Sequence, residues 1–302
     1  MKLVYVDPTN CNSTNHYETA PFKFENSDII LDTNYYDTIK GTWMEKKLRE
    51  LFLHVWIDDN VMYGEKEPCD KFFTVYHLNY EFYFADHWAH VVDGMHVIRY
   101  SPTEMSAMYK RDFSKLQDLI RRINEVVKEC YNEKTRTCAF VKLGSSSTKH
   151  DYPPEQVFNG EDAIQHLLGS DSVLRFLSCG VIIVRKWRDD ITRFNEFRVF
   201  IKTHKVIGIS QQFIYESIPF SYENVYSDMS KDIQQLWDNI KNRLEYKDAI
   251  LDVWFDYDMK PQLIEINPHG PWTGAGSSLF HWIDDTMEKG SSEFRLTEWK
   301  SI

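Results

Sequence analysis

The stretch AILDVWFDYDMKPQLIEIN, residues 249–267, gives the clearest indication of the fold of this chain. Its two ends, 249–255 and 262–267, are rich in aliphatic, β-branched and aromatic side chains, as strands are. Between them stands DYDMKP, whose aspartates and proline are common turn residues. The pattern predicts a β-hairpin. From the composition of this loop, we expect the turn to be centred between Asp258 and Met259.

Three polar side chains interrupt this apolar hairpin. In the register set by that turn, Asp252 faces Glu265, and Ile250 faces Asn267. Directly opposed residues of an antiparallel pair share a face, and so do residues two apart on one strand. We therefore expect Asp252, Glu265 and Asn267 to cluster on one side of the hairpin.

Two opposed carboxylates in an otherwise apolar sheet would repel each other and would be costly to desolvate. A bound cation would remove both costs. Two carboxylates and an amide oxygen are hard ligands that suit Mg²⁺. The alternative is an exposed acidic sheet face, with Asn267 opening a turn before Pro268.

The rest of the chain shows helical and extended periodicities in alternation. The predicted helices cover 44–57, 111–130 and 161–169, and a further helical face runs from 233 to 244. The predicted strands cover 72–84, 138–143, 181–184, and a hairpin of 196–202 with 205–211. This order favours an α+β protein with antiparallel sheets.

The composition excludes several classes of protein. There are 35 basic and 46 acidic residues, for a net charge of −11. That charge disfavours nucleic acid as a partner and suits a partner with basic patches, although it could serve solubility alone. Five cysteines without a CxxC pair indicate neither a disulfide framework nor a zinc site. The first apolar run is too short for a signal peptide, and no stretch reaches the ~20 apolar residues of a membrane span. We expect a cytoplasmic protein with no membrane partner.

Familiar nucleotide motifs are absent from the sequence. There is no G-x-x-x-x-G-K-[ST] and no kinase H-R-D or D-F-G element. The K-x-D-G lysine of covalently adenylylated ligases is also missing.

Several separate segments nevertheless match one family in order and spacing. The stretch from Val181 to Trp282 resembles the cell division cycle protein 123 family, a divergent clade of the ATP-grasp fold. The matching segments are RKW at 185–187, EFRVF at 196–200, VIGISQ at 206–211, LDV at 251–253, LIEINP at 263–268 and SLFHW at 278–282. Upstream, Val141-Lys142-Leu143 and the serines after it resemble the family's nucleotide-phosphate strand and turn.

This resemblance implies an ATP-grasp-like α+β fold, in which two lobes with antiparallel sheets sandwich a nucleotide cleft. On this basis we expect an N-terminal lobe over residues 1–190 and a C-terminal lobe over residues 191–302. The metal-binding hairpin would belong to the second lobe. The resemblance also implies that Asp252, Glu265 and Asn267 hold Mg²⁺ against the phosphates of ATP.

The resemblance further implies which residues contact the nucleotide. Lys142 is expected on a phosphate, a task that suits its compact charge. Lys186 and Trp187 are expected at the adenine hinge through backbone groups, and Arg185 on the phosphate side. Arg198 is expected to face the triphosphate, since its fork suits phosphate oxygens. The full set of expected cofactor-binding residues is Lys142, Ser146, Arg185, Lys186, Trp187, Arg198 and Gln211.

Gln211 enters this set because we expect Glu196 and Arg198, on one strand face, to lie beside it. Plainer alternatives exist for other members. Lys142 could be a solvated strand residue, Trp187 could be core, Arg198 could form a surface ion pair with Glu196, and Ser146 could belong to an ordinary flexible turn. Two departures from the family are visible. Glu265 stands where the family has aspartate, and His150 separates a basic residue from an aspartate that are adjacent in the family. The first hundred or so residues show no clear match.

The function implied by the resemblance is that of an ATP-dependent assembly chaperone. It would help build eukaryotic translation initiation factor 2 by binding its γ subunit. The alternative is an ATP-grasp ligase that activates a carboxylate of a protein acceptor, or acts on an RNA acceptor, which the net charge disfavours. The sequence identifies no catalytic residue and no acceptor, and whether ATP is turned over stays open.

Overall fold

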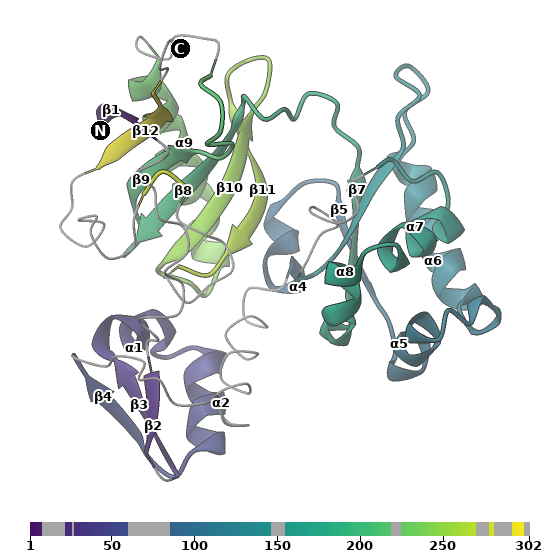
Figure 1. The fold of residues 1–302 in the computed structure, drawn as a ribbon, viewed down its shortest axis with the longest axis horizontal. Coiled ribbons are helices and arrows are strands. Elements are labelled where there is room, and N and C mark those ends of the chain that lie inside the picture. The colour runs from purple at the N-terminus through teal and green to yellow at the C-terminus, as the bar shows by residue number, and fades with distance from the viewer. Residues whose placement is uncertain are drawn as a thin grey trace. The chain divides into compact units, whose positions relative to one another are not determined.

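The computed structural model describes residues 1–7, 22–25, 27–59, 85–145, 155–218, 225–269, 278–280 and 292–298. Its contacts divide the chain into two compact units (Figure 1). The terminal unit contains Met1–Asn79 and Asp190–Ile302, and the middle unit contains Tyr80–Asp189. The change of unit after Asp189 lies beside the boundary expected at residue 190, whereas the first 79 residues group with the C-terminal ones.

A six-stranded sheet forms the core of the terminal unit, in the order β1-β12-β9-β8-β10-β11 (Figure 1). The strands are β1 (Lys2–Val6), β8 (Glu196–Lys202), β9 (Lys205–Gln211), β10 (Ala249–Phe255), β11 (Pro261–Asn267) and β12 (Glu293–Thr297). Pairs among β8 to β11 are antiparallel, while β12 runs parallel to β1 and β9. Both predicted hairpins and the α+β class are therefore confirmed.

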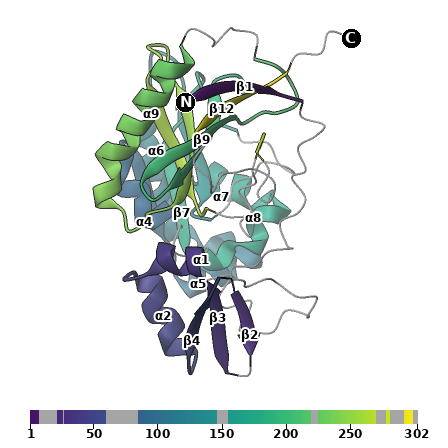
Figure 2. The same cartoon turned by 90° about the vertical axis from the view of Figure 1, so that its left-hand side faces the viewer.

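One face of this sheet is covered by α9 (Tyr226–Ile240), as Figure 2 shows. The buried residues of α9 recur every three or four positions and are Met229, Ile233, Trp237 and Ile240. Tyr226 contacts the ring of Phe294, which in turn lies against Phe197. Side chains alternate along a strand. The residues that follow Phe197 and Phe294 therefore point to the opposite face.

The other strands that the structure describes in the terminal unit form a small sheet in the order β2-β3-β4. The elements are β2 (Phe22–Glu25), β3 (Asp28–Asp32), α1 (Thr33–Ile39), α2 (Trp43–Leu51) and β4 (Val55–Asp58). The helix predicted over 44–57 is wrong in its second half. Residues 55–58 instead pair in parallel with β3, so sheet pairing overrides the local helical periodicity there. The strand predicted over 72–84 lies outside the described residues.

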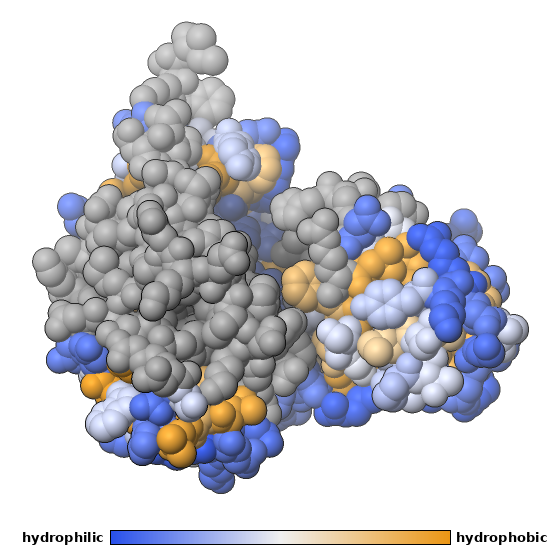
Figure 3. Space-filling model, turned by 60° about the horizontal axis from the view of Figure 1, so that its bottom comes forward, coloured by the Kyte–Doolittle hydropathy of each residue, from blue (hydrophilic) through white to orange (hydrophobic). Residues whose placement is uncertain are grey.

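The middle unit consists of an antiparallel sheet, β5-β7-β6, packed against helices. Its elements are α4 (Ala85–Trp88), β5 (Met95–Arg99), α5 (Pro102–Tyr109), α6 (Gln117–Cys130), β6 (Ala139–Leu143), α7 (Gly160–Leu168), α8 (Asp171–Arg175) and β7 (Val181–Lys186). Leu119, Ile123, Val127 and Cys130 are buried on α6, which confirms the predicted helical face. In Figure 3, polar and apolar side chains are interspersed on the visible surface of this unit. None of the helices in the described ranges has the length and apolar character needed to cross a membrane.

Candidate functional site

The hairpin of β10 and β11 brings the three predicted metal ligands together. Asp252 lies directly opposite Glu265, and Ile250 lies opposite Asn267, as the sequence predicts. Closer to the turn the pairing is shifted by one residue, and Ile264 is the extra residue of a β-bulge. A regular hairpin grown from that turn would place Ile264 opposite Asp252 and would direct Glu265 to the other face. The bulge therefore places the two carboxylates on one face.

A row of polar side chains crosses the sheet on the face opposite α9. Successive register pairs join Arg295 to Ser210, Ser210 to Arg198, Arg198 to Asp252, and Asp252 to Glu265. We call these five residues the polar row. Two positive charges lie on β12 and β8, and two negative charges lie on β10 and β11. Because each residue belongs to a paired strand, the backbone ladder fixes the positions of their Cα atoms.

A buried ion pair occupies the centre of the polar row. Asp252 is fully buried, and the side chain of Arg198 is 7% exposed. Arg198 donates from Nε to Oδ1 and from Nη2 to Oδ2 of Asp252, both at 2.8 Å. Burial alone would lower the pKa of Arg198. The charge and hydrogen bonds of Asp252, together with the charges of Glu265 and Glu196, outweigh burial, so the pKa lies above its usual value. The guanidinium thus supplies positive charge to this acidic cluster.

Asn267 joins the two carboxylates. Its Nδ2 donates to Oδ2 of Asp252 at 3.3 Å and to Oε1 of Glu265 at 3.2 Å. Two carboxylates and an amide are a donor set suited to a hard divalent cation. Rotation about the last side-chain bond would turn the amide oxygen of Asn267 toward such an ion. The described residues contain no group of three or more His, Cys, Asp or Glu that could hold a metal ion.

Gln211 points away from the polar row, so the expectation that it lies beside Arg198 is wrong. Ser210 is opposite Arg198, and Gln211 is opposite Phe197 on the face covered by α9. The reason is a second β-bulge, in which Ile207 is the extra residue of β9. A regular hairpin would have placed Gln211 with Arg198, but the bulge reverses the face of every residue beyond it.

The amide of Gln211 instead anchors the loop that follows β9. Its Oε1 accepts a hydrogen bond from the backbone N–H of Thr297 at 3.1 Å. Its Nε2 donates to the carbonyl oxygens of Phe213 and Glu216. Gln211 is fully buried, and a ligand contact would require one of these bonds to be exchanged.

A second group of predicted residues gathers in the middle unit around Phe140. Arg185 is opposite Phe140, and Lys142 is two residues further along the same strand, so all three share a face. The guanidinium of Arg185 lies 5.2 Å from the centre of the Phe140 ring. The ring of Trp187 lies 6.4 Å from the same centre. Phe140 was not among the residues predicted from the sequence, because a phenylalanine in a short apolar strand is typical of core.

Lys186 and Trp187 differ in how they are placed. Lys186 is opposite Ala139, so it points to the other face of the sheet, and it is exposed. The backbone N–H of Trp187 donates to the carbonyl of Cys138 at 3.0 Å, and its indole N–H donates to Asp189 at 2.6 Å. Their expected contacts with adenine stay predictions. Ser146 lies outside the described residues.

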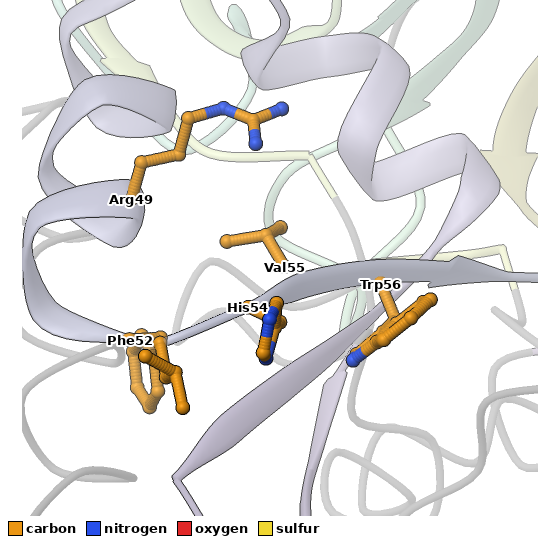
Figure 4. A pocket seen from close by; sticks show the side chains of 6 residues that line it. Arg49, Phe52, His54, Val55 and Trp56 are labelled. Carbon is orange, nitrogen blue, oxygen red and sulfur yellow. The ribbon is translucent and has the colours of Figure 1, made fainter.

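A pocket in the N-terminal part of the terminal unit contains none of the predicted residues (Figure 4). Its volume is about 260 Å³, and it is lined by Arg49, Phe52, Leu53, His54, Val55 and Trp56. Asp28 accepts hydrogen bonds from the indole of Trp56 at 3.0 Å and pairs with His54 at 3.2 Å. These two contacts hold the pKa of Asp28 below its usual value, with the larger effect from Trp56.

Comparison with known proteins gives three similarities. The D123 family model matches residues 145–301. The translation initiation factor eIF2 assembly protein of Danio rerio is 30% identical over 143 residues, which are 44% of this chain and 39% of that protein. The protein of the same name from Xenopus laevis is 31% identical over 109 residues, or 33% and 29% of the two chains. The alignments thus span less than half the length of these relatives.

The fold is also found in a solved structure. Cdc123 from Schizosaccharomyces pombe superposes with a TM-score of 0.59 at 19% identity, over 73% of this chain and 97% of that one. The matched range of the family model contains all of β7 to β12, including the β10–β11 hairpin and the polar row. The chain therefore belongs to the D123 family.

Proposed function

We propose that this protein binds ATP–Mg²⁺ at the polar row and acts as an assembly factor for translation initiation factor eIF2, through its γ subunit. The observation that carries the proposal is the convergence of Asp252, Glu265 and Asn267 on one sheet face. The names of the Danio and Xenopus relatives support the assembly role.

The chemistry of the site supports a nucleotide carried by a cation. Asp252, Glu265 and Asn267 would hold Mg²⁺, which when bound neutralises part of the triphosphate charge. The guanidinium of Arg198 also lies beside these carboxylates, so the site has less net negative charge to repel the phosphates. Lys142 and Arg185 stay predicted phosphate contacts, and replacing each by methionine tests them through the affinity for ATP.

The charge of the chain supports a protein partner with basic patches. The net charge of −11 would favour association with such a surface and would disfavour RNA. Nucleotide would act on this association by favouring one conformation of the protein. Assembly of a translation factor would place this activity in the cytoplasm.

A capture experiment tests the proposal. Immobilised protein is incubated with purified eIF2 γ subunit, with ATP and Mg²⁺ or with EDTA. The proposal predicts stronger capture with ATP–Mg²⁺, and loss of that gain in Asp252→Asn. Asp228→Asn is the matched control, because Asp228 is an exposed helix residue paired with Lys231. Equal capture in all conditions would contradict the proposal.

The same samples are assayed for release of ADP, AMP and phosphate. Without turnover, nucleotide-dependent capture supports an assembly factor. Turnover that requires a protein or RNA acceptor, and that Asp252→Asn abolishes, would instead indicate the ATP-grasp ligase.

A further inference from the structure

The outer edge of β4 is open in the part of the chain that the structure describes. Among the described strands, β4 stands at the end of the small sheet and pairs in parallel with β3 (Figure 1). The register pairs join Ile29 to Val55 and Leu31 to Ile57. In a parallel ladder a residue bonds to the neighbours of its register partner, and Ile29 accordingly donates to the carbonyl of His54 at 3.1 Å. The N–H and C=O groups of Val55 and Ile57 therefore point outward, away from β3.

Apolar side chains are exposed along the same edge. Leu53, Trp56 and Ile57 are 73%, 55% and 48% exposed. The pocket of Figure 4 is lined from both faces of β4, with Val55 on the side of Arg49 and Trp56 on the other side, so it follows the edge of the strand. An end strand with outward backbone groups and exposed apolar side chains is a template on which a further strand can pair.

The sequence of β4 is complementary to itself in the antiparallel direction. With a two-fold axis at Trp56, Val55 of one copy faces Ile57 of the second copy, and both carry outward backbone groups. They therefore form a directly hydrogen-bonded pair, as antiparallel geometry requires. Trp56 faces its own symmetry mate in the intervening non-hydrogen-bonded pair, where side chains approach most closely and where aromatic pairs are stabilising.

The charges at the two ends of β4 favour this arrangement. Arg49 and His54 lie beside the start of the strand, whereas Asp58 and Asp59 lie at its end. Antiparallel self-pairing brings the start of one strand to the end of the other, so His54 faces Asp58 of the second copy. Parallel pairing would instead place the two acidic ends side by side, which is unfavourable. The pocket beside the start of β4 would then receive the apolar side chain of Ile57 from the second copy.

We propose that two copies of this chain associate by antiparallel pairing of their β4 strands, with Trp56 at the two-fold axis. The two small sheets would join into one continuous sheet across that axis. A contact built on a strand of four residues is smaller than the ~1,600 Å² of a standard stable interface, so the dimer would be reversible and dependent on concentration. The proposal is independent of the proposed function, since β4 lies outside residues 145–301, which the family model matches.

Sedimentation velocity of the full chain, from about 1 to 200 µM, tests the association. The wild-type protein should shift from monomer to dimer within this range. Ile57→Lys should weaken dimerisation by about tenfold or more, because an added lysine on an end strand opposes pairing. Tyr5→Lys is the matched control and should leave dimerisation unchanged, because Tyr5 is a 46% exposed aromatic residue on β1, the end strand of the other sheet.

A second variant guards against misfolding of the first. If Ile57→Lys gives an altered circular dichroism spectrum, Leu53→Asp is measured instead, because Leu53 is the most exposed apolar residue of this edge. Its new carboxylate would lie opposite Asp59 of the second copy and should likewise weaken the dimer. A wild-type protein that stays monomeric up to about 200 µM would overturn the proposal, as would a dimer that neither edge variant weakens.

Disulfide trapping tests the register. In the proposed pairing the Cα atoms of Trp56 and its symmetry mate lie about 4.5 Å apart, within the range that a disulfide spans. In a buffer of oxidised glutathione, Trp56→Cys should therefore give a covalent dimer on a non-reducing gel. Tyr5→Cys is the control for an exposed cysteine, and the wild-type protein is the control for its native cysteines. Covalent dimer no greater than in these two controls would overturn the pairing centred on Trp56.

Discussion

The buried pair of Arg198 and Asp252 makes a quantitative prediction for stability. We consider three variants without ligand: Arg198→Met, Asp252→Leu, and the double variant. Each single variant leaves one charged group buried without the partner it has in the native protein. Breaking a buried ion pair from one side typically costs about 3–5 kcal/mol of unfolding free energy. The double variant removes both charges and replaces the ion pair by an apolar contact of similar volume.

The double variant should therefore be much more stable than either single variant. Replacement of a complete buried pair by apolar residues is often neutral or stabilising. Here the loss of the Asn267 contact to Asp252 adds a hydrogen-bond cost of about 1 kcal/mol. We expect a double-variant cost below about 2 kcal/mol, against about 6–10 kcal/mol if the two single costs were additive.

Hydrogen exchange of the β8 and β10 amides measures this directly, because it reports local opening without assuming that both units unfold together. A cost of about 3 kcal/mol corresponds to roughly a hundredfold loss of protection, since each 1.4 kcal/mol is a factor of ten. Arg193→Met is the control, because Arg193 is a half-exposed arginine of the same unit that pairs with Glu216. It should leave the protection of the β8 and β10 amides unchanged. Single-variant costs below about 1 kcal/mol, or additive costs in the double variant, would refute the account of this pair.

Three further predictions concern other parts of the chain. Gly208→Ala should destabilise the terminal unit by about 1–3 kcal/mol, because the added Cβ would lie 2.8 Å from the Phe280 ring. Urea unfolding measures this loss of stability, and an unchanged unfolding midpoint would contradict the prediction. Gly160→Ala should cost the middle unit at least as much, because its Cβ would lie 2.0 Å from the carbonyl oxygen of Ile120, and protection of the α6 amides should fall. Burial lowers the pKa of His166 below its usual 6.5, so its contribution to stability is present above pH 6.5 and is lost as the pH falls toward the folded pKa. His166→Gln should flatten the unfolding midpoint of the middle unit between pH 7 and 5, and an equally steep decline would contradict this.

Two β-bulges decided how well the sequence predicted the site. Local patterns located both hairpins, since alternation and turn residues are properties of short segments. Bulges are single extra residues, at Ile264 and Ile207, and nothing in the apolar runs around them marks their position. The turn of the β10–β11 hairpin is centred slightly away from its expected place. The bulge at Ile264 compensates for this shift, so Asp252 and Glu265 face each other as predicted.

At Ile207 the bulge has the opposite effect on the prediction. It turns Gln211 to the helix-covered face and brings Ser210 next to Arg198. The pairing of Arg198 with Asp252 was missed for a related reason. It depends on contacts between two hairpins separated by α9 in the sequence, and local periodicity carries no information about which strands of different hairpins become neighbours. The same limit explains why the parallel pairing of β4 was missed.

The most direct test of the central claim is to locate a divalent cation crystallographically. Crystals grown with Mn²⁺ and a non-hydrolysable ATP analogue would be measured at a wavelength where manganese scatters anomalously. The account predicts an anomalous peak within ligand distance of oxygen atoms of Asp252, Glu265 and Asn267, with a phosphate oxygen on the same ion. Manganese and nucleotide bound elsewhere, with these three side chains contacting neither, would contradict it.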